Sequence, residues 1–429
     1  MHKQMSMFGD NGDNEIVPLL SDEDVLDKRS EYTQKRHDGK RVIAWVTGVS
    51  GCGRREYVKL QQQLTRANGE HFEVLDGAYF MRKTVKDSGM SMNWDNILDV
   101  RMDTLQDIRR KAYREMADII RDNGDVDFAV LSHGVFDWHN MVIPGYDPST
   151  FEGDMKPDIC INVMDNEEFV SQELNRRTQW KDQGMTPERA MRWLSEEFNE
   201  TKNMADRVGV PWYVITRYMA PTTMYMLLYH PERPWVYYAQ QMTHADDDAY
   251  DEADALFCKL VRMFAVTNPK GYEILGYGMN DSTCYFTDHR DTQGFVQQND
   301  MTIAFHQNAD GYNRRLRDFA DRHGLEPEAA EELMALAGRG PAPSAGVMAE
   351  LSDARGSGKD TYTIWPSDYF SPFIRSKSKR IFKTPDECME FLVEEYGPPL
   401  GIQIPKHVMD DAFCPHGRKR ILPPNAYSL

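Results

Sequence analysis

The sequence has few cysteines and no obvious arrangement of metal ligands. Its six cysteines are scattered through 429 residues, at positions 52, 160, 258, 284, 388 and 414, and form no C-x-x-C pair. Such scattering indicates a reduced intracellular compartment rather than a disulfide framework. Cys414 and His416, in FCPHG, have a spacing that could suit a metal, but they have no second pair beside them. We therefore expect no metal site.

The sequence also lacks a long apolar run and an excess of positive charge. No run approaches the length of a membrane span, and the acidic N-terminal stretch shows neither a signal peptide nor an arginine-rich transit pattern, so we expect a cytoplasmic protein. The net charge is −18 at pH 7. Broad nucleic-acid binding, which depends on neutralising phosphates, is therefore not expected. The length predicts two domains.

Strand and helix patterns alternate from residue 41 onward. Helical periodicity separates the strands, and this alternation predicts a parallel sheet with right-handed crossovers. Residues 1–40 form an acidic N-terminal arm, mobile or docked, and the first domain spans 41–216. The expected strands are 41–47, 71–77, 127–134, 158–165 and 211–216, and the expected helices are 55–67, 96–124 and 186–209.

The alternation restarts after residue 216, and we expect a second, smaller domain over 217–366 with a helical insertion near 311–340. The chain is thus predicted to be α/β, with two three-layer α/β/α parallel-sheet domains. Residues 367–429 are expected to form a loop-rich tail whose basic islands suit an acidic partner. The expected strands are 234–243, 265–269, 299–305 and 360–366, and the expected helices are 248–264 and 345–358.

A glycine-rich loop, GVSGCGRRE, follows the first expected strand. Gly48, Gly51 and Gly53 fit the pattern G-x-x-x-x-G-K-[ST], in which backbone N–H groups converge on a phosphate at a helix N-terminus. Arg54 and Arg55 replace the lysine and the hydroxyl residue, so the side chain that holds magnesium is missing. Three interpretations stay open: a degenerate nucleotide-binding loop, a kinase that uses arginine, and a turn without a ligand.

The chain over about 41–216 resembles the archaeal-type adenylate kinases. The likeness includes the loop and the stretches LDGAYFM, AVLSHGVF and NRRTQWKDQGMTPE. It implies the fold of a P-loop nucleoside-monophosphate kinase, which would use ATP and Mg²⁺ if it were active. By this resemblance Arg176 and Arg177 match lid arginines that neutralise the transferred phosphate, and Asp76 lies where the acceptor nucleotide is held.

A second motif lies in APSAGVMAELSDARGSGK. Ser344 and Gly346 precede Glu350 in a turn that opens a helix, and a position near the helix N-terminus favours the carboxylate form of Glu350. Asp300 begins the strand NDMTIAF, and Tyr237 lies in the strand VYYAQQMT.

These segments resemble the nucleoside 2-deoxyribosyltransferases and the related deoxynucleoside-monophosphate N-glycosidases. The shared order covers about 234–366: a tyrosine strand, a strand ending at Pro269, an aspartate strand, S-x-G-x-x-x-E, and a G-K strand at Gly358 and Lys359. The resemblance implies a flavodoxin-like domain that cleaves or exchanges the N-glycosidic bond of a nucleoside or nucleotide without a cofactor. It also implies self-association, or a place in a larger complex.

The resemblance assigns roles that suit glycosidic chemistry. Glu350 is the nucleophile that meets positive charge developing at C1′, Asp300 is the acid or base-orienting group, and Tyr237 positions Glu350. The substrate-binding residues are Ser344, at the sugar 5′ end, Gly346 and Gln241.

The chain departs from this family at Gln240 and Gln241, where a glycine and a small residue are usual. Each candidate also has a structural interpretation. Glu350 would be a solvated helix residue, Asp300 a turn residue at the start of a strand, Tyr237 a core residue and Ser344 a helix cap. Two alternatives to an N-glycosidic enzyme stay open for the whole protein: an inactive structural subunit of a larger assembly, and an active nucleotide kinase.

Overall fold

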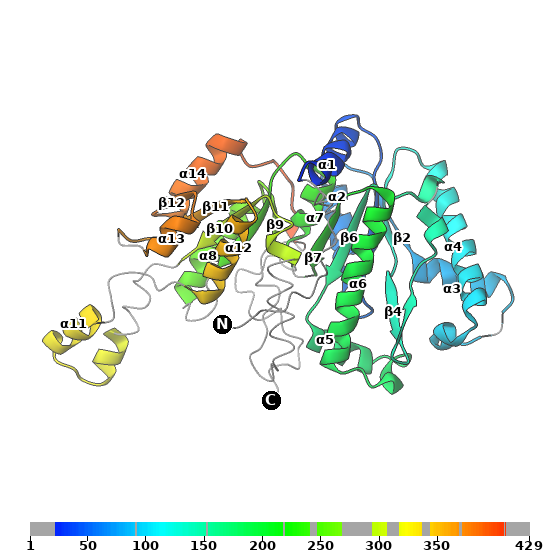
Figure 1. Cartoon of the computed structure of the whole chain (residues 1–429), viewed down its shortest axis with the longest axis horizontal. Coiled ribbons are helices and arrows are strands. Elements are labelled where there is room, and N and C mark those ends of the chain that lie inside the picture. Colours follow the sequence, from blue (N-terminus) through cyan, green and yellow to red (C-terminus); the bar gives the residue numbers. More distant parts are fainter. Residues whose placement is uncertain are drawn as a thin grey trace, which may run out of the picture.

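The computed structural model describes residues 22–90, 92–151, 153–217, 219–240, 247–267, 294–306, 317–336, 344–368, 371–406 and 408. Within them, Figure 1 shows two sheets side by side, each with helices on both faces. Both sheets have five strands, and every strand pair in them is parallel. The chain is therefore α/β with two three-layer domains, which confirms the predicted fold class.

The first sheet has the strand order β2–β3–β1–β6–β7. Its three central strands are buried along their whole length because helices cover both faces, so they appear in the sequence as continuous apolar runs. The strands are β1 (Ile43–Thr47), β2 (Phe72–Asp76), β3 (Asp127–Leu131), β6 (Ile159–Met164) and β7 (Trp212–Thr216).

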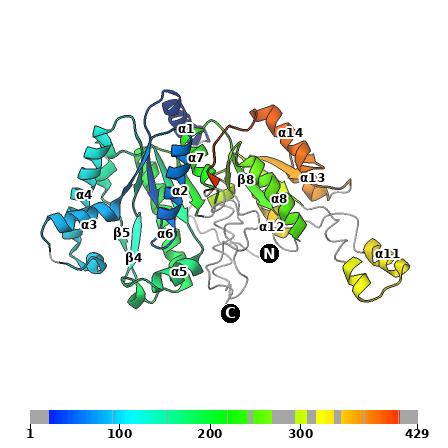
Figure 2. The same cartoon turned by 180° about the vertical axis from the view of Figure 1, so that it is seen from behind.

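Helices α2 and α7 cover one face of this sheet, and α4 and α6 cover the other, as Figures 1 and 2 show. The sequence sets the ends of α6, because the Thr186 hydroxyl accepts the N–H of Arg189 and Gly209 ends the helix with φ 73°. The helices are α2 (Arg54–Ala67), α3 (Gly77–Asp87), α4 (Met102–Asp122), α5 (Glu167–Asn175), α6 (Pro187–Val208) and α7 (Pro221–Tyr229). The short 3₁₀ helices are η1 (Trp94–Asp99), η2 (Pro148–Phe151), η3 (Gly153–Met155) and η4 (Lys181–Gln183).

Helices α3 and α5 were not predicted, and two further local features of the first domain differ from the sequence prediction. The single helix expected over 96–124 is divided into η1 and α4, because Val100 has extended backbone dihedrals. An unpredicted hairpin, β4 (Val135–Trp138) and β5 (Met141–Pro144), follows β3. Its turn places His139 and Asn140 at positive φ, a conformation usually signalled by glycine.

The second sheet has the strand order β12–β11–β10–β8–β9. In chain order this is the doubly wound arrangement of flavodoxin-like domains. The strands are β8 (Trp235–Gln240), β9 (Ala265–Thr267), β10 (Met301–Phe305), β11 (Asp360–Ile364) and β12 (Arg380–Phe382). The helices are α8 (Asp247–Leu260), α11 (Pro327–Leu336), α12 (Ala345–Gly356), α13 (Pro372–Lys377) and α14 (Pro385–Tyr396). Helices α8 and α14 pack on one face and α12 on the other.

The second domain extends beyond residue 366, which corrects the expectation of a loop-rich tail. Strand β12 pairs with β11, and Cys388, Met389 and Leu392 of α14 are buried in the core. The three-residue β12 is too short to show a periodicity, but the cap and apolar spacing of α14 were readable.

A continuous core and helix α7 join the two domains. The rings of Tyr213 in β7 and Trp235 in β8 lie 4.5 Å apart, centre to centre. The N–H of Val214 donates to the side-chain oxygen of Gln298 at 2.9 Å, and the Gln298 amide donates back to the Val214 carbonyl at 2.8 Å. In the edge strand β7, the backbone N–H and carbonyl of Val214 are therefore both hydrogen-bonded by a side chain of the second domain.

Helix α1 (Asp22–His37) binds three aspartates that lie at or just before the starts of strands. Arg29 donates to both carboxylate oxygens of Asp300 at 2.7 and 2.6 Å. Lys35 pairs with Asp158, and Arg36 donates to Asp127 at 3.1 Å. We call these three ion pairs the α1 clamp. They attach residues of the expected N-terminal arm to both sheets.

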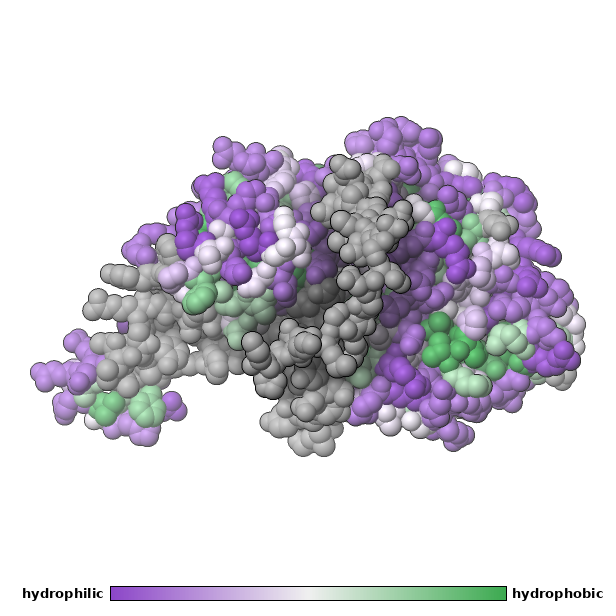
Figure 3. All heavy atoms as spheres, viewed as in Figure 1, coloured by the Kyte–Doolittle hydropathy of each residue, from purple (hydrophilic) through white to green (hydrophobic). Residues whose placement is uncertain are grey.

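The surface drawn in Figure 3 is mostly hydrophilic, in keeping with the charge of the chain. No helix in the described part of the chain is long and apolar enough to cross a membrane.

We predict that Arg29→Ala lowers the free energy of unfolding by about 2 kcal/mol, because it leaves the half-buried Asp300 carboxylate without its cation. Lys28→Ala, which breaks an exposed pair with Asp206, should change it by less than about 0.5 kcal/mol. Urea unfolding midpoints measure both, and equal effects would contradict a specific role for Arg29.

Candidate functional site

The second sheet has its topological switch point between β8 and β10. The chain leaves β8 through α8 toward β9, and leaves β10 through α12 toward β11 on the opposite face. Doubly wound sheets bind ligands in a crevice outside the carboxyl ends of the strands at this point, which here are the ends of β8 and β10. Gln240 and Phe305 are register partners at these two ends.

Tyr237 and Glu350, which are 113 positions apart in the sequence, meet in the structure. The Tyr237 hydroxyl donates to Glu350 Oε1 at 2.6 Å. Tyr237 is fully buried in β8, and Glu350 is half-buried in the second turn of α12. A buried strand residue thus fixes one oxygen of a carboxylate that remains partly accessible.

The N-terminus of α12, on the same helix as Glu350, is not filled by other side chains. Ser344 occupies the N-cap position, but its hydroxyl makes no capping hydrogen bond. A Cβ atom on the exposed Gly346 would meet only the Ser344 hydroxyl oxygen, at 3.9 Å. A polar ligand group can therefore approach the N-terminus of α12 closely.

Two buried polar side chains at the switch point make no hydrogen bond to any residue that the structure describes. Gln240 is 4% exposed, and neither its amide oxygen nor its nitrogen is bonded. His306, directly after β10, is fully buried with both ring nitrogens unbonded. Burial lowers the pKa of His306 to about 4, so the ring is neutral at pH 7. Such groups cost free energy unless a ligand or water satisfies them.

The structure does not bring Asp300 to Glu350. Asp300 precedes β10 at the amino end of the sheet, where its carboxylate binds Arg29 and accepts the N–H of Trp235 at 2.6 Å. These are the contacts of a residue that starts a strand, so we remove Asp300 from the catalytic set. In the sequence, Asp300 directly precedes the apolar run of β10, and this position already indicated that it lies at the amino end of that strand.

The other predicted residues of this domain lie apart from the pair or outside the description. Gly358, with φ 74°, and Lys359 end α12, and the Lys359 N–H donates to the carbonyl of Ala354 at 2.9 Å. They therefore form a helix terminus rather than part of the crevice. Gln241 and Pro269 lie outside the described residues.

The glycine loop of the first domain has the backbone that its sequence predicts. Gly48, Gly51 and Gly53 all have positive φ, at 149°, 90° and 74°. The Gly48 N–H donates to Glu197 Oε1 at 2.9 Å, and the same buried carboxylate accepts the N–H groups of Gly134 and Val135. Burial raises the pKa of Glu197, while these N–H groups oppose the rise.

The two arginines of the loop are engaged within the protein. Arg54 donates to the carbonyl oxygens of Gly48, at 2.9 Å, and Ser132, and one of its nitrogens lies 3.2 Å from His133 Nε2. Arg55 pairs with Asp76 at 2.6 Å, and Asp76 also caps α3. The sequence motif therefore assembles, but with its positive charges held by internal acceptors.

The expected lid arginines lie on the surface at the end of α5. Arg177 pairs with Glu173 of the same helix at 3.0 Å, and Arg176 is exposed at the C-cap. Arg217, which sequence reasoning missed, lies over the loop instead. A Cβ atom on Gly53 would come within 2.4 Å of Arg217 Cδ. Arg217 Nε lies 3.0 Å from Asp165, and burial raises the pKa of that carboxyl to about 7 against the opposing arginine charge.

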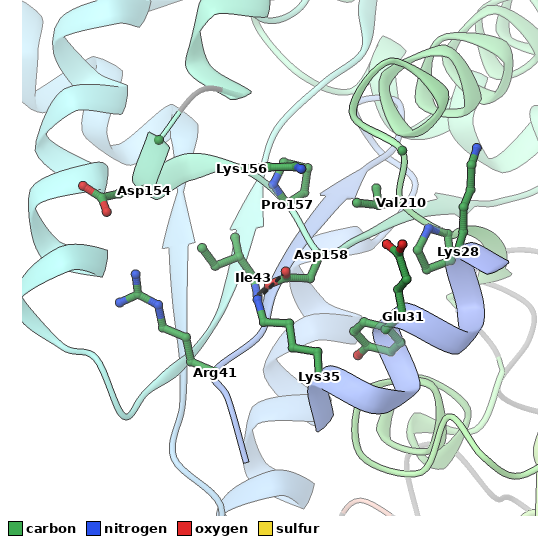
Figure 4. Close-up of a pocket in the computed structure, with 14 residues that line it drawn as sticks. Lys28, Glu31, Lys35, Arg41, Ile43, Asp154, Lys156, Pro157, Asp158 and Val210 are labelled. Atoms are coloured by element: carbon green, nitrogen blue, oxygen red, sulfur yellow. Dashed lines mark hydrogen bonds and ion pairs between the residues drawn. The ribbon is translucent and has the colours of Figure 1, made fainter. Parts of the chain in front are cut away.

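A cavity of about 330 Å³ lies against α1 at the amino edge of the first sheet, as Figure 4 shows. Lys35 and Asp158 line it and already pair with one another. Ile43, the first residue of β1, and Val210, two residues before β7, also line it, so the cavity lies away from the glycine loop. We assign it no chemistry.

No group of three potential metal ligands occurs within the described ranges. No protein-family model matches the chain, and no curated protein sequence is significantly similar to it.

We predict that Gly48→Ala lowers the free energy of unfolding by about 2 kcal/mol or more, because its Cβ would lie 2.5 Å from the carbonyl oxygen of Val163. Gly51→Ala also strains a positive φ, but its nearest neighbours are the side chains of Glu173, at 3.4 Å, and Leu174, at 3.5 Å, so it should cost about 1 kcal/mol. Thermal unfolding of both variants tests this order. The reverse order would show that β6 does not support the loop in this way.

Proposed function

We propose that the second domain cleaves or exchanges the N-glycosidic bond of a nucleoside or nucleotide, with Glu350 as nucleophile. The observation that carries this proposal is the 2.6 Å hydrogen bond from Tyr237 to Glu350, beside the switch point of a doubly wound sheet. The resemblance to nucleoside 2-deoxyribosyltransferases and deoxynucleoside-monophosphate N-glycosidases supports the same roles.

The chemistry needs a carboxylate of fixed orientation on one face of the sugar. Glu350 attacks C1′ as the bond to the base breaks, and the base leaves with the bonding electron pair and takes up a proton from solvent. Water, or a second base in an exchange, then attacks C1′ and releases the Glu350 carboxylate. The Tyr237 hydroxyl holds one carboxylate oxygen so that attack requires little reorganisation.

The substrate groups can be matched to polar atoms around the crevice. The uncapped N-terminus of α12 at Ser344 suits the 5′-hydroxyl or 5′-phosphate of the sugar. Gln240 and His306 each present a donor and an acceptor, which is the pattern that a nucleobase edge complements. The departure at Gln240 then belongs to substrate recognition.

We predict that Glu350→Gln lowers base release about a thousandfold or more, since it removes the nucleophile. Tyr237→Phe should lower it about tenfold to a hundredfold, which corresponds to one lost hydrogen bond to a charged group. The measurement is chromatography of free base after incubation with deoxynucleosides, deoxynucleoside monophosphates and NAD, with and without an acceptor base.

Glu394→Gln, an exposed carboxylate in α14, is the matched control and should leave base release unchanged. Absence of base release from every substrate would reject the proposal and favour the structural-subunit interpretation, which copurification with partners would then test. Consumption of ATP with an acceptor and Mg²⁺, without base release, would favour the kinase interpretation instead.

We predict different stability effects for two glutamines, the buried Gln240 and the half-buried Gln298. Gln240→Met removes an amide without hydrogen bonds and should not destabilise the protein, whereas Gln298→Met breaks two bonds to β7 and should cost about 1–3 kcal/mol. If Gln240 binds substrate, its variant should also raise KM about tenfold with a smaller change in kcat. An unchanged KM would remove Gln240 from the site.

A further inference from the structure

Three buried side chains in the described part of the chain have more than one polar atom and no hydrogen bond to any of them. Two are Gln240 and His306, at the proposed glycosidic site. The third is Arg109, in the first domain, whose three guanidinium nitrogens are all unbonded. Arg109 carries a full charge and belongs to neither the sequence motif nor the proposed reaction, so it requires a separate explanation.

Arg109 lies on α4, beside the loop that follows β3. Its side chain is fully buried, and its guanidinium carbon is 5.9 Å from the centre of the Phe136 ring. The Phe136 ring lies 4.4 Å from the ring of His133, which comes two residues after β3. Because β3 pairs with β1, this places Arg109 on the side of the sheet where the glycine loop begins.

The groups around Arg109 leave a positive charge without a counterion. Arg54 donates to His133 Nε2, so the neutral ring carries its proton on Nδ1. Burial and the charges of Arg54, Arg109 and Arg55 lower the pKa of His133 well below its usual value, which keeps the ring uncharged. Glu197 lies 3.9 Å from His133 but is bound by three backbone N–H groups.

The nearby carboxylates have partners of their own. Asp147, whose charge acts on Arg109, pairs with Arg110 at 2.7 Å and accepts from Ser149. A buried, unpaired guanidinium costs several kcal/mol, and it does not lose its proton in proteins. A mobile anion is the remaining way to neutralise it.

We propose that Arg109 binds a phosphate-type oxyanion at the carboxyl edge of the first sheet, beside the glycine loop. A guanidinium presents a planar fork of N–H donors that matches two oxygens of such an anion. Because Arg109 is fully covered, neighbouring side chains must move when the anion enters.

A second unsatisfied side chain on α4, that of Gln106, indicates which kind of oxyanion binds. Gln106, three residues before Arg109 on α4, has a buried side-chain oxygen without a hydrogen bond. This oxygen needs a donor, which the hydroxyl of hydrogen phosphate or a sugar hydroxyl next to a phosphoryl group supplies. Sulfate at neutral pH has no such donor. The ligand is therefore inorganic phosphate or a phosphate monoester such as a nucleoside monophosphate.

The test is thermal unfolding of the full chain against inorganic phosphate and a nucleoside 5′-monophosphate, with chloride at matched ionic strength. The wild type should gain roughly 5 °C in Tm at about a hundred times the dissociation constant. Arg109→Met should abolish this gain while its Tm without ligand stays equal to or above that of wild type, because a buried unpaired charge is removed.

Arg114→Met is the matched control, since Arg114 is exposed on the same helix and should leave the phosphate response intact. Arg109→Lys keeps the charge without the fork and should weaken binding about tenfold or more, which gives a second variant if Arg109→Met does not fold. An equal phosphate response in wild type and Arg109→Lys, or none in wild type, would overturn the proposal.

The ligand series separates the sources of the oxyanion. Binding of the nucleoside monophosphate at least tenfold tighter than phosphate would support a nucleotide site, and equal binding would support an inorganic anion site. Stabilisation by sulfate equal to that by phosphate would overturn the role of Gln106. Base release by the second domain is measured separately, so this proposal and the proposed function can fail independently.

Discussion

Aspartates at the amino ends of strands carry the interaction on which the arrangement of this protein depends. Asp158 and Asp300, one in each domain, use the same contacts. Each donates its N–H to the carbonyl of the neighbouring strand at 2.8 Å, accepts the first N–H of that strand on its carboxylate, and binds a cation of α1. Asp127 adds a third such site, since it accepts the Val42 N–H at 2.6 Å and binds Arg36. One helix therefore closes the amino edges of both sheets. These pairs are partly exposed, so each contributes modestly, and their main effect is to fix geometry.

The closed amino edges contrast with the carboxyl edges. Among the described residues, three buried side chains with more than one polar atom make no hydrogen bond, and these three, Arg109, Gln240 and His306, belong to the carboxyl side of their sheets. Parallel sheets direct loops and helix N-termini to that side, where ligands are bound by groups that the fold itself leaves unsatisfied. Stability thus depends on satisfied polar groups at one edge, whereas the proposed chemistry depends on unsatisfied ones at the other. The exclusion of Asp300 from the catalytic set and the inclusion of Gln240 in the proposed recognition of substrate follow from the same division.

The sequence predicted the elements whose apolar residues repeat over several turns or fill a strand. It could not predict β12, which has three residues, or the β4–β5 hairpin, whose turn uses His139 and Asn140 where glycine is the usual signal. The spacing of Ser344, Gly346 and Glu350 correctly placed Glu350 on a helix, but its contact with Tyr237 depends on which strand lies beneath α12. Arg109 lies within the apolar stripe of α4, four residues after Leu105 and four before Tyr113, whereas the exposed Arg110 lies outside it. The helical pattern alone does not show whether an arginine in such a stripe is covered. Only the packing of the folded chain shows that Arg109 is buried.

The glycine loop and the end of β8 both depart from the motifs that they resemble, but the departing side chains differ in whether the fold satisfies them. Arg54 and Arg55 replace the lysine and hydroxyl of a phosphate loop, yet carbonyl oxygens and Asp76 hold them, so their charges are neutralised inside the fold. A loop built in this way has a defined structure without a ligand. Gln240 stands where the family that this segment resembles usually has a glycine. It makes no hydrogen bond to any described residue, so the fold bears the cost of a buried amide. A substitution that served only to fill space would use an apolar side chain there. The unsatisfied amide is therefore easier to explain by a ligand than by packing, and the same reasoning applies to the charge on Arg109.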